Sequence, residues 1–281
     1  MSKPIFSKEF INKLNSDIKT YFPHLFLIDE TMKTTFEGVS RLVMLDRYSQ
    51  KDINHVSLSV GDLVLCIIKD DPKFPTRGIG YIEKIEDDYA YIRLEPEYIG
   101  MCSDVLDEDG LIKRGINAID KPLELFYEQI CHRVANNLGM GETYETVQQF
   151  YYELSNLNLV PAGRVLFGAG SQTAVTYFNC FVMPFIHDSR GGISIHRQKV
   201  MEIMSRGGGV GTNGSTLRPK NSLAKGVGGK SSGAVSWLHD LSQLTHLVEQ
   251  GGSRRGAQMI MLADWHPDII EFIISKMQNP K

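Results

Sequence analysis

Lysines, arginines and glycines gather in the last quarter of this 281-residue chain, in an arrangement suited to binding phosphate. Residues 224–231, AKGVGGKS, fit the loose P-loop pattern of a small residue, four free positions and Gly-Lys-Ser. Arg218, Lys220, Lys225 and Lys230 lie in or beside this segment, among glycines whose backbone can approach a ligand closely. The pattern indicates a loop for an anionic phosphate group, with a solvated surface loop as the plain alternative.

A true P-loop is not expected here, because the flanking residues have the wrong character. In a P-loop a buried strand runs into the glycines, and a helix starts directly after Lys-Ser. The preceding residues 215–223, STLRPKNSL, contain Pro219 and no apolar run, and the pattern begins with Ala224 instead of Gly. No later strand ending in Asp supplies a magnesium carboxylate. A P-loop phosphotransferase or NTPase is therefore a minor alternative.

Two glycine runs each follow a predicted helix, at 205–214 (SRGGGVGTNG) and 249–258 (EQGGSRRGAQ). A single glycine after a helix is an ordinary C-cap, but runs of two or three exceed what capping requires. Glycine costs roughly 1 kcal/mol relative to alanine in regular structure, so these runs indicate backbone exposed to a ligand or loops that change shape. Arg254 and Arg255 can serve phosphate or base recognition.

Residues 1–158, which precede these loops, divide into two regions by apolar periodicity. Residues 1–120 begin with a helical pattern and then alternate apolar and polar residues, which predicts a small β-barrel-like domain of SH3 size at about 56–99. We expect it to be an accessory packing or interaction module. Residues 121–158 predict two amphipathic helices separated by GMGE, with Cys131 as a buried, inert thiol beside the first apolar stripe.

The third region, 159–281, alternates strands and helices. A strand is predicted within 176–184, helices at about 192–205 and 234–248, and a strand at 259–263. The last helix is opened by DWHPDIIEFI, which is expected to place Pro267 in its first turn and Asp268 near the positive end of its dipole. This succession predicts an α/β layer or barrel.

Composition excludes several classes of protein. The chain is 42% hydrophobic and 22% charged with a formal net charge of −3, which is typical of a globular protein and does not suggest nucleic-acid binding. No apolar stretch has the length of a membrane helix, and the N-terminus lacks the apolar core of a signal peptide, so we expect a cytoplasmic protein. The four cysteines are widely spaced without CxxC, which argues against a metal site or a disulfide scaffold; they are Cys66, Cys102, Cys131 and Cys180.

Six motifs follow one another in this sequence: VPAGRVLFGAG, NCFV, MSRGGGVGTN, GKSSGAVSWLHDL, EQGGSRRGAQMIML and HPDIIEFI. Together they resemble the large catalytic subunit of ribonucleotide reductases over about residues 125–281. Their order and spacing make the resemblance specific, and the wording PAGRVLFGAG followed by FNCFV is most similar to the adenosylcobalamin-dependent class II enzymes, with class I as the close alternative. RLVMLDRYSQKD near the start also looks like class II. No ATP-cone motif is visible at the N-terminus.

The resemblance implies a fold and a chemistry. The fold is the N-terminal half of a ten-stranded α/β barrel, preceded by a helical segment and the small β-domain. Removal of the ribose 2′-hydroxyl needs two electrons, which two facing thiols can supply by closing into a disulfide. Cys180 then corresponds to one cysteine of this redox pair. Without the resemblance, Cys180 would be interpreted as a buried thiol on a strand. Substrate contacts carried over from the family are Pro161, Ala162, Asn179, Gly208 and Gly209.

The resemblance also implies regulation. In this family a deoxynucleoside triphosphate or ATP effector binds at the interface of a homodimer and biases which base is reduced. Glycine-rich mobility suits such loops, because an effector acts only through different affinities for two arrangements. A helix N-terminal acid is the plain alternative for Asp188. The residues that correspond to effector contacts are Asp188, Ser189, Arg218, Lys225 and Arg254.

Two expected parts of such an enzyme are not found in this sequence. The family's thiyl-radical cysteine lies in a later Asn-x-Cys-x-Glu motif, and neither it nor the second redox cysteine is present. We therefore expect the chain to need a C-terminal partner chain or the missing C-terminal half for turnover, with a thioredoxin-like reductant, and the adenosylcobalamin site to lie outside this chain. A nucleotide-binding regulatory protein without catalysis is the other alternative.

Overall fold

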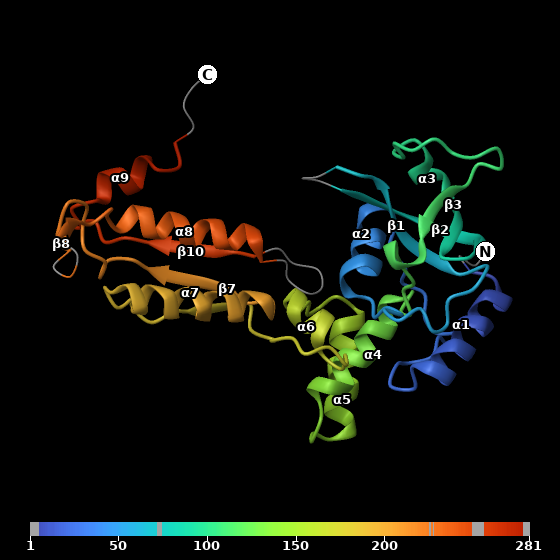
Figure 1. Cartoon of the computed structure of the whole chain (residues 1–281). Coiled ribbons are helices and arrows are strands. Elements are labelled where there is room, and N and C mark those ends of the chain that lie inside the picture. The colour runs from blue at the N-terminus through green and yellow to red at the C-terminus, as the bar shows by residue number, and fades with distance from the viewer. Residues whose placement is uncertain (1–5, 72–74, 225, 227, 249–255, 278–281) are drawn as a thin grey trace. The chain divides into compact units, whose positions relative to one another are not determined.

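The chain divides into two compact units, unit 1 at Met1–Gln172 and unit 2 at Thr173–Lys281. The computed structural model describes residues 6–71, 75–224, 226, 228–248 and 256–277. Residues 159–172, which the sequence groups with the barrel region, fall in unit 1. Each unit is described by itself below and can be followed by colour in Figure 1.

Unit 1 contains a five-stranded sheet in the order β4-β3-β2-β1-β5, and all its pairings are antiparallel. The predicted small β-domain lies within this sheet, which extends past residue 99 through β4 and β5. The two edge strands are not paired with each other among the described residues, so closure into a barrel stays a prediction. The strands are β1 (Leu63–Lys69), β2 (Thr76–Glu86), β3 (Tyr89–Leu94), β4 (Ile112–Gly115) and β5 (Ile119–Asp120).

Helices surround this sheet and share one apolar core with it. The two helices predicted between 121 and 158 are confirmed as α4 and α5, which pack against each other. Cys131 is fully buried in α4, as predicted. The helices are α1 (Lys8–Tyr21), α2 (Gly38–Val43) continuing into a π-turn at Met44–Tyr48, α3 (Pro96–Ile99), a 3-10 turn at Ile116–Ala118, α4 (Tyr127–Leu138), α5 (Tyr144–Ser155) and α6 (Gly163–Gly168).

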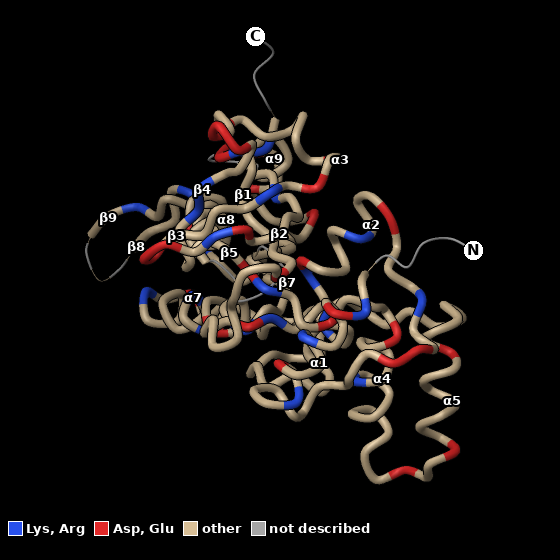
Figure 2. Tube along the Cα trace, turned by 90° about the vertical axis from the view of Figure 1, so that its right-hand side faces the viewer, with Lys and Arg blue, Asp and Glu red and all other residues tan. Residues whose placement is uncertain are grey.

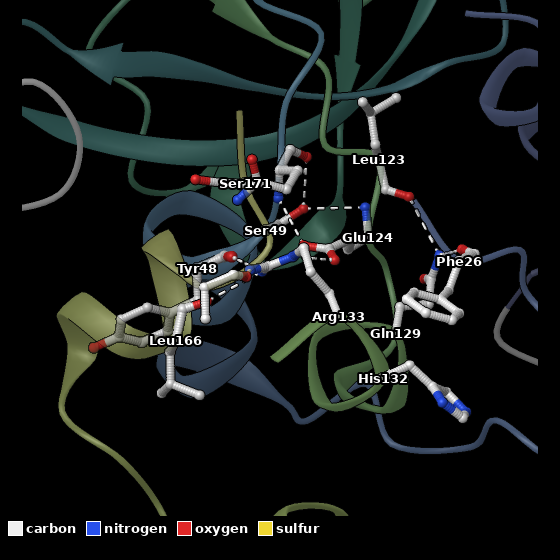
Figure 3. Close-up of polar contacts among 12 residues, drawn as sticks. Phe26, Tyr48, Ser49, Leu123, Glu124, Gln129, His132, Arg133, Leu166 and Ser171 are labelled. Carbon is white, nitrogen blue, oxygen red and sulfur yellow. Dashed lines mark hydrogen bonds and ion pairs between the residues drawn. The ribbon is translucent and has the colours of Figure 1, made fainter. Parts of the chain in front are cut away.

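The guanidinium of Arg133 in α4 forms a buried ion pair and also binds the end of the short helix α6 (Figure 3). Arg133 Nε donates to Glu124 Oε1 at 2.7 Å, and both side chains are almost completely inaccessible. The same guanidinium donates to the carbonyl oxygens of Leu166 at 3.1 Å and Ala169 at 2.6 Å, at the C-terminal end of α6. Because the last carbonyls of a helix lack partners within it, Arg133 both caps α6 and holds it in place.

Unit 2 is a three-stranded parallel sheet in the order β10-β7-β6, joined by helices. Right-handed crossovers place α7 and α8 on one face of such a sheet, and Met204 of α7, Val210 of β7 and Leu244 of α8 share one apolar cluster there. The predicted α/β alternation is thus confirmed for this part. The elements are β6 (Cys180–Val182), α7 (Arg190–Ser205), β7 (Gly209–Asn213), β8 (Leu223–Ala224), β9 (Gly229–Lys230), α8 (Ala234–Leu247), β10 (Gln258–Met261) and α9 (Ile269–Ile274).

The glycine run at 205–214 is not the exposed loop that its composition suggested. Gly209–Asn213 forms β7, the central strand of the sheet, and only Gly207, with φ of 86°, turns the chain after α7. A Cβ on Gly208 would come within 2.7 Å of the Phe181 ring and of Ile203. The close packing of Phe181 and Ile203 against the backbone therefore requires glycine at position 208, whether or not a ligand binds there.

Charge and hydropathy add two observations. Among the residues that the structure describes, Lys and Arg are interspersed with Asp and Glu along the trace, without a continuous stripe of one sign (Figure 2). Within the described segments, no helix combines the length and the apolar character needed to cross a membrane.

Candidate functional site: an exposed thiol and a cation-lined cavity

Cys180 begins β6 and is solvent exposed, not buried. It pairs in register with Gly209 of β7, and Gly211 pairs with both Val182 and Met259. Paired residues of parallel strands point to the same face, and Val182 and Met259 are 90% and 60% exposed. Cys180 therefore lies on the sheet face opposite to α7 and α8, which is exposed among the described residues of unit 2.

The backbone of Asn179 and Gly209 lies close to the Cys180 thiol, so one ligand can contact the backbone and the thiol together. Gly209 N donates to Asn179 O at 2.7 Å. An ideal Cβ on Gly209 would lie 3.5 Å from Cys180 Sγ and 3.5 Å from Ala257 O. Two of the five predicted substrate residues, Asn179 and Gly209, thus lie beside Cys180, whereas the Cβ position of Gly208 faces Phe181 and Ile203.

The other two predicted substrate residues, Pro161 and Ala162, lie in unit 1. They precede α6, where Ala162 is the N-cap residue and its carbonyl oxygen accepts from Val165 N at 2.8 Å. Arg133 anchors the opposite end of this helix. The structure gives Pro161 and Ala162 a defined local conformation and does not place them relative to Cys180.

Two of the other three thiols, Cys66 and Cys131, are buried. Burial raises the pKa of Cys66 to about 11 and that of Cys131 to about 12, which disfavours their reactive thiolate forms at neutral pH. Cys102 is partly exposed. All three belong to unit 1, so Cys180 is the one cysteine of unit 2.

A cavity of about 370 Å³ opens at the N-terminal end of α7. Its volume lies within the range of about 300–1,000 Å³ typical of small-molecule sites. Three of the five predicted effector residues, Asp188, Ser189 and Arg218, line it. The other two, Lys225 and Arg254, lie outside the described residues.

Hydrogen bonds at this helix end differ from the simplest expectation for Asp188. Ser189, not Asp188, caps α7, because its Oγ accepts from Gly192 N at 3.0 Å. Asp188 instead accepts from Arg218 Nε at 2.8 Å through a carboxylate oxygen, and its carbonyl oxygen accepts from Arg218 Nη2 at 3.2 Å. This ion pair is partly exposed and so contributes little, about 0–1 kcal/mol.

The cavity also contains residues that the predicted effector set did not include. Arg190 and Lys230 add positive charge, and the positive end of the α7 helix dipole favours an anion further. Trp237 of α8 adds an aromatic wall. Arg190 directly follows the predicted effector residues Asp188 and Ser189 in the sequence. This adjacency could have identified Arg190 as a cavity residue. The full lining is Asp188, Ser189, Arg190, Ile193, Arg218, Ala224, Gly226, Lys230, Ser231, Ser232 and Trp237.

The AKGVGGKS segment is not a P-loop, as the sequence predicted. Lys230 lies in β9, which pairs antiparallel with β8 as a short hairpin, and the next helix starts only at Ala234. The backbone N–H groups of a helix therefore do not follow Lys230 directly, as a P-loop requires.

The WHPD motif holds the segments that wall the cavity. Its predicted place at the start of α9 is confirmed for Asp268, the N-cap residue, but not for Pro267, which lies before the helix instead of in its first turn. Pro267 and Asp268 precede α9, and Asp268 makes no side-chain cap to that helix. The Asp268 carboxylate instead accepts from Ala234 N at 2.9 Å, at the start of α8, and from Lys220 N at 3.1 Å. His266 Nδ1 accepts from Asp268 N at 3.0 Å, so its Nε2 carries the proton that bonds Leu217 O at 2.9 Å. These two side chains, the His266–Asp268 clamp, fix both segments that wall the cavity.

A second cavity, of about 430 Å³, lies between β6 and α7. It is lined mainly by apolar side chains such as Phe181, Met183 and Ile195, with Lys199 and Glu202 among its polar groups. It shares none of its lining residues with the cation-lined cavity.

Comparison with known proteins gives one family. Residues 178–281 match the family model described as ribonucleotide reductase, barrel domain. The chain is 38% identical over 210 residues to a vitamin B12-dependent ribonucleoside-diphosphate reductase of Thermoplasma acidophilum, an alignment that covers 72% of this chain and 27% of that protein. It is 34% identical over 140 residues to a protein of the same name from Mycobacterium tuberculosis, covering 50% of this chain and 20% of that one.

A relative without B12 in its name is also similar. The ribonucleoside-diphosphate reductase large chain of Cryptosporidium parvum is 28% identical over 187 residues, which is 66% of this chain and 22% of that protein. The chain thus spans between 20% and 27% of the length of these three relatives. Residues 178–281 belong to the ribonucleotide reductase barrel domain, and the chain is a homologue of the large chains of ribonucleoside-diphosphate reductases.

Proposed function

We propose that this chain is the N-terminal portion of a ribonucleotide reductase that converts ribonucleotides to deoxyribonucleotides under control of a deoxynucleoside triphosphate effector. The observation that carries the proposal is the position of Cys180. Its thiol is exposed on the open sheet face, beside the backbone of Asn179 and Gly209, within the part of the chain that matches the reductase barrel.

Cys180 acts in this proposal as one of two redox thiols. The substrate loses its 2′-hydroxyl as water and gains a hydrogen at C2′, a two-electron reduction started by a thiyl radical. Cys180 and a second cysteine outside this chain supply the two electrons and two protons as their sulfurs join in a disulfide. A thioredoxin-like dithiol then reduces that disulfide. Turnover therefore needs the remaining part of the barrel.

Effector control is assigned to the cation-lined cavity. Arg190, Arg218 and Lys230 together with the start of α7 offer the charge that a triphosphate requires, and Trp237 offers a face for stacking a base. The deoxynucleoside triphosphate is favoured over a phosphate ion because the cavity of about 370 Å³ combines these cations with an aromatic wall. By family resemblance, the same cavity lies at the interface of a homodimer.

Adenosylcobalamin is the radical source proposed for the complete enzyme, because relatives at 38% and 34% identity are named for vitamin B12. A corrin ring with its axial groups does not fit either described cavity, which measure about 430 and about 370 Å³. No step of the mechanism is therefore derived through the cofactor on these residues.

Nucleotide binding by the isolated chain tests the proposal. We expect dATP, dTTP or dGTP to bind in equilibrium dialysis, and we expect no ribonucleotide reduction with adenosylcobalamin and dithiol. Arg218→Leu should weaken binding about tenfold or more, since a charged hydrogen bond to phosphate contributes about 1.5–3 kcal/mol. Arg206→Leu, which removes an exposed cation paired with Glu202 outside the cavity, is the matched control.

Three results would contradict parts of this proposal. Absence of nucleotide binding would contradict the assignment of effector control to the cavity. Turnover by the isolated chain would contradict the proposal that the remaining part of the barrel is needed. If the full reductase, reconstituted with its C-terminal part, bound triphosphates but never ribonucleoside substrates, the chain would be a regulatory nucleotide-binding protein.

A further inference from the structure

Three stacked rings join three elements of unit 1; we call them the His132 stack. The imidazole of His132 in α4 lies between the ring of Phe26 and the ring of Tyr151 in α5. Phe26 belongs to the connector between α1 and α2, residues 22–37. The ring centroids are 5.2 Å apart on the Phe26 side and 3.9 Å apart on the Tyr151 side, with planes inclined by 20° and 17°. The imidazole therefore contacts the connector with one face and α5 with the other.

Two neighbouring side chains of α4 bind the backbone of the same connector. Gln129 Nε2 donates to Phe26 O at 3.0 Å (Figure 3). The Glu128 carboxylate accepts from Lys33 N at 3.2 Å and from Thr34 N at 3.1 Å. The amides of Lys33 and Thr34 are thus protected by the docking of the connector on α4, and their exchange with solvent reports its release.

The stack suits a neutral imidazole. Among the residues that the structure describes, neither ring nitrogen of His132 has a hydrogen-bond partner. Protonation gives both nitrogens an N–H group and so adds a donor for which the docked connector offers no acceptor. Burial is the largest influence on the ring and lowers the pKa of His132, whereas the charges of Asp29 and Glu128 act to raise it.

His132 is the group of this cluster that responds near neutral pH. The groups that face it are Asp29 of the connector, Glu128 of α4 and the phenol of Tyr151 in α5. The hydrogen bond from the Thr31 hydroxyl is the largest cause that lowers the pKa of Asp29, and burial raises the pKa of Tyr151. These shifts move both groups away from neutral pH, whereas the ordinary histidine pKa is about 6.5.

We propose that the His132 stack is a pH-sensitive switch, in which protonation of His132 releases the connector from α4 and α5. A released connector leaves the ring in water, where it binds a proton more readily than in the stack. Because the pKa is lower in the docked state, docking has its full stability above about pH 6.5 and loses it as the pH falls toward the docked value. All these residues belong to unit 1, so the inference is independent of the proposed function.

Hydrogen exchange of the whole chain at pH 7.5 and pH 5.5 tests the switch. The protection of each amide is its exchange rate in an unstructured peptide divided by its rate in the protein at the same pH, which removes the intrinsic effect of pH. We expect the protection of Lys33 and Thr34 to fall about threefold or more at pH 5.5, because a pKa difference between two states changes their ratio by up to tenfold per pH unit. The amides of β2, in the same unit, serve as the reference.

Two variants assign the response to one histidine. His132→Phe keeps a ring in the stack and cannot be protonated, so protection should be the same at both pH values. His24→Asn removes an exposed histidine of the same connector and should keep the response of the parent. If His132→Phe does not fold, NMR titration of the parent decides the question. His132 should then titrate at lower pH than His239, which is exposed in α8, and in step with the loss of protection.

Four outcomes would overturn the proposal. The first is equal protection of Lys33 and Thr34 at both pH values in the parent. The second is a full response in a folded His132→Phe chain, and the third is loss of the response in His24→Asn, which would assign it to that histidine. The fourth is a rise of protection in acid, which would mean that stacking on Phe26 and Tyr151 stabilises the charged ring more than burial opposes it.

Discussion

At the scale of single residues, Arg133 and Glu124 form a buried ion pair in unit 1 that is costly to disturb. Both are buried, and the Glu124 carboxylate also accepts from Gln50 N at 2.9 Å, while Arg133 bonds carbonyl oxygens of α6. Each charge is thus compensated by its partner and by the backbone. Removing either side chain leaves an ion in an interior without solvent.

We expect Arg133→Met to lower the free energy of unfolding by about 3–5 kcal/mol, because Glu124 becomes an unpaired buried charge. Urea unfolding followed by circular dichroism measures the change. Arg93→Met, at an exposed pair with Glu83, is the matched control and should have little effect. Equal losses in the two variants would contradict this account of the buried pair.

At the scale of elements, the His266–Asp268 clamp sets the shape of the cavity without lining it. Asp268 joins three separate segments, because it precedes α9, caps α8 and holds the backbone of Lys220. Gly233 explains how the carboxylate reaches the start of α8. Its φ is 97°, and a Cβ there would lie 2.9 Å from Asp268 Oδ2, so a side chain would block the contact.

Asp268→Ala should cost about 0.5–2 kcal/mol in unfolding free energy as a lost helix cap. It should also weaken nucleotide binding, since Arg218 and Trp237 lie on the two segments that the clamp fixes. Thermal unfolding and equilibrium dialysis of the same preparations separate these effects. Asp264→Ala, an exposed carboxylate in the same segment, should change neither. An Asp268→Ala chain with unaltered affinity would limit the clamp to a stabilising role.

The sequence predicts an element only where its side chains show a periodic apolar pattern. The helices α4, α5, α7 and α8 follow from apolar periodicity, because their buried faces recur every three or four residues. The strand β7 does not, since its glycines carry no side chains from which a period of two can be read. The clamp is also invisible in sequence, because Asp268 and Lys220 are 48 positions apart and meet only in the fold.

The candidate site follows the same rule. Asn179, Cys180 and Gly209 come from motifs local in sequence, and β6 and β7 bring them together. Arg190 and Lys230 belong to the cavity lining only because the β8–β9 hairpin and the start of α7 face each other there. Resemblance to a family supplied the first set, and geometry was needed for the second.

At the scale of the whole molecule, the two units have separate apolar cores. The core of unit 1 runs from Phe6 to Ala169, and the clusters of unit 2 lie between Met183 and Leu244. The residues of the cation-lined cavity all belong to unit 2. A ligand in this cavity therefore stabilises the unit that contains both the cavity and the exposed thiol.

Hydrogen exchange along the full chain measures where that stabilisation falls. At a nucleotide concentration of about 100 times the dissociation constant, binding adds about 2.7 kcal/mol to the opening free energy of the structure that holds the ligand. We expect slower exchange at the start of α7, in 217–224 and at the start of α8, and unchanged exchange in α4 and α5. Arg218→Leu at the same nucleotide concentration should reduce the slowing, to about 1.4 kcal/mol for a tenfold weaker affinity, whereas Arg206→Leu should keep it in full. Slowing that is equal in both units would mean that the ligand acts on unit 1 as well, and the cavity could then not be its sole site.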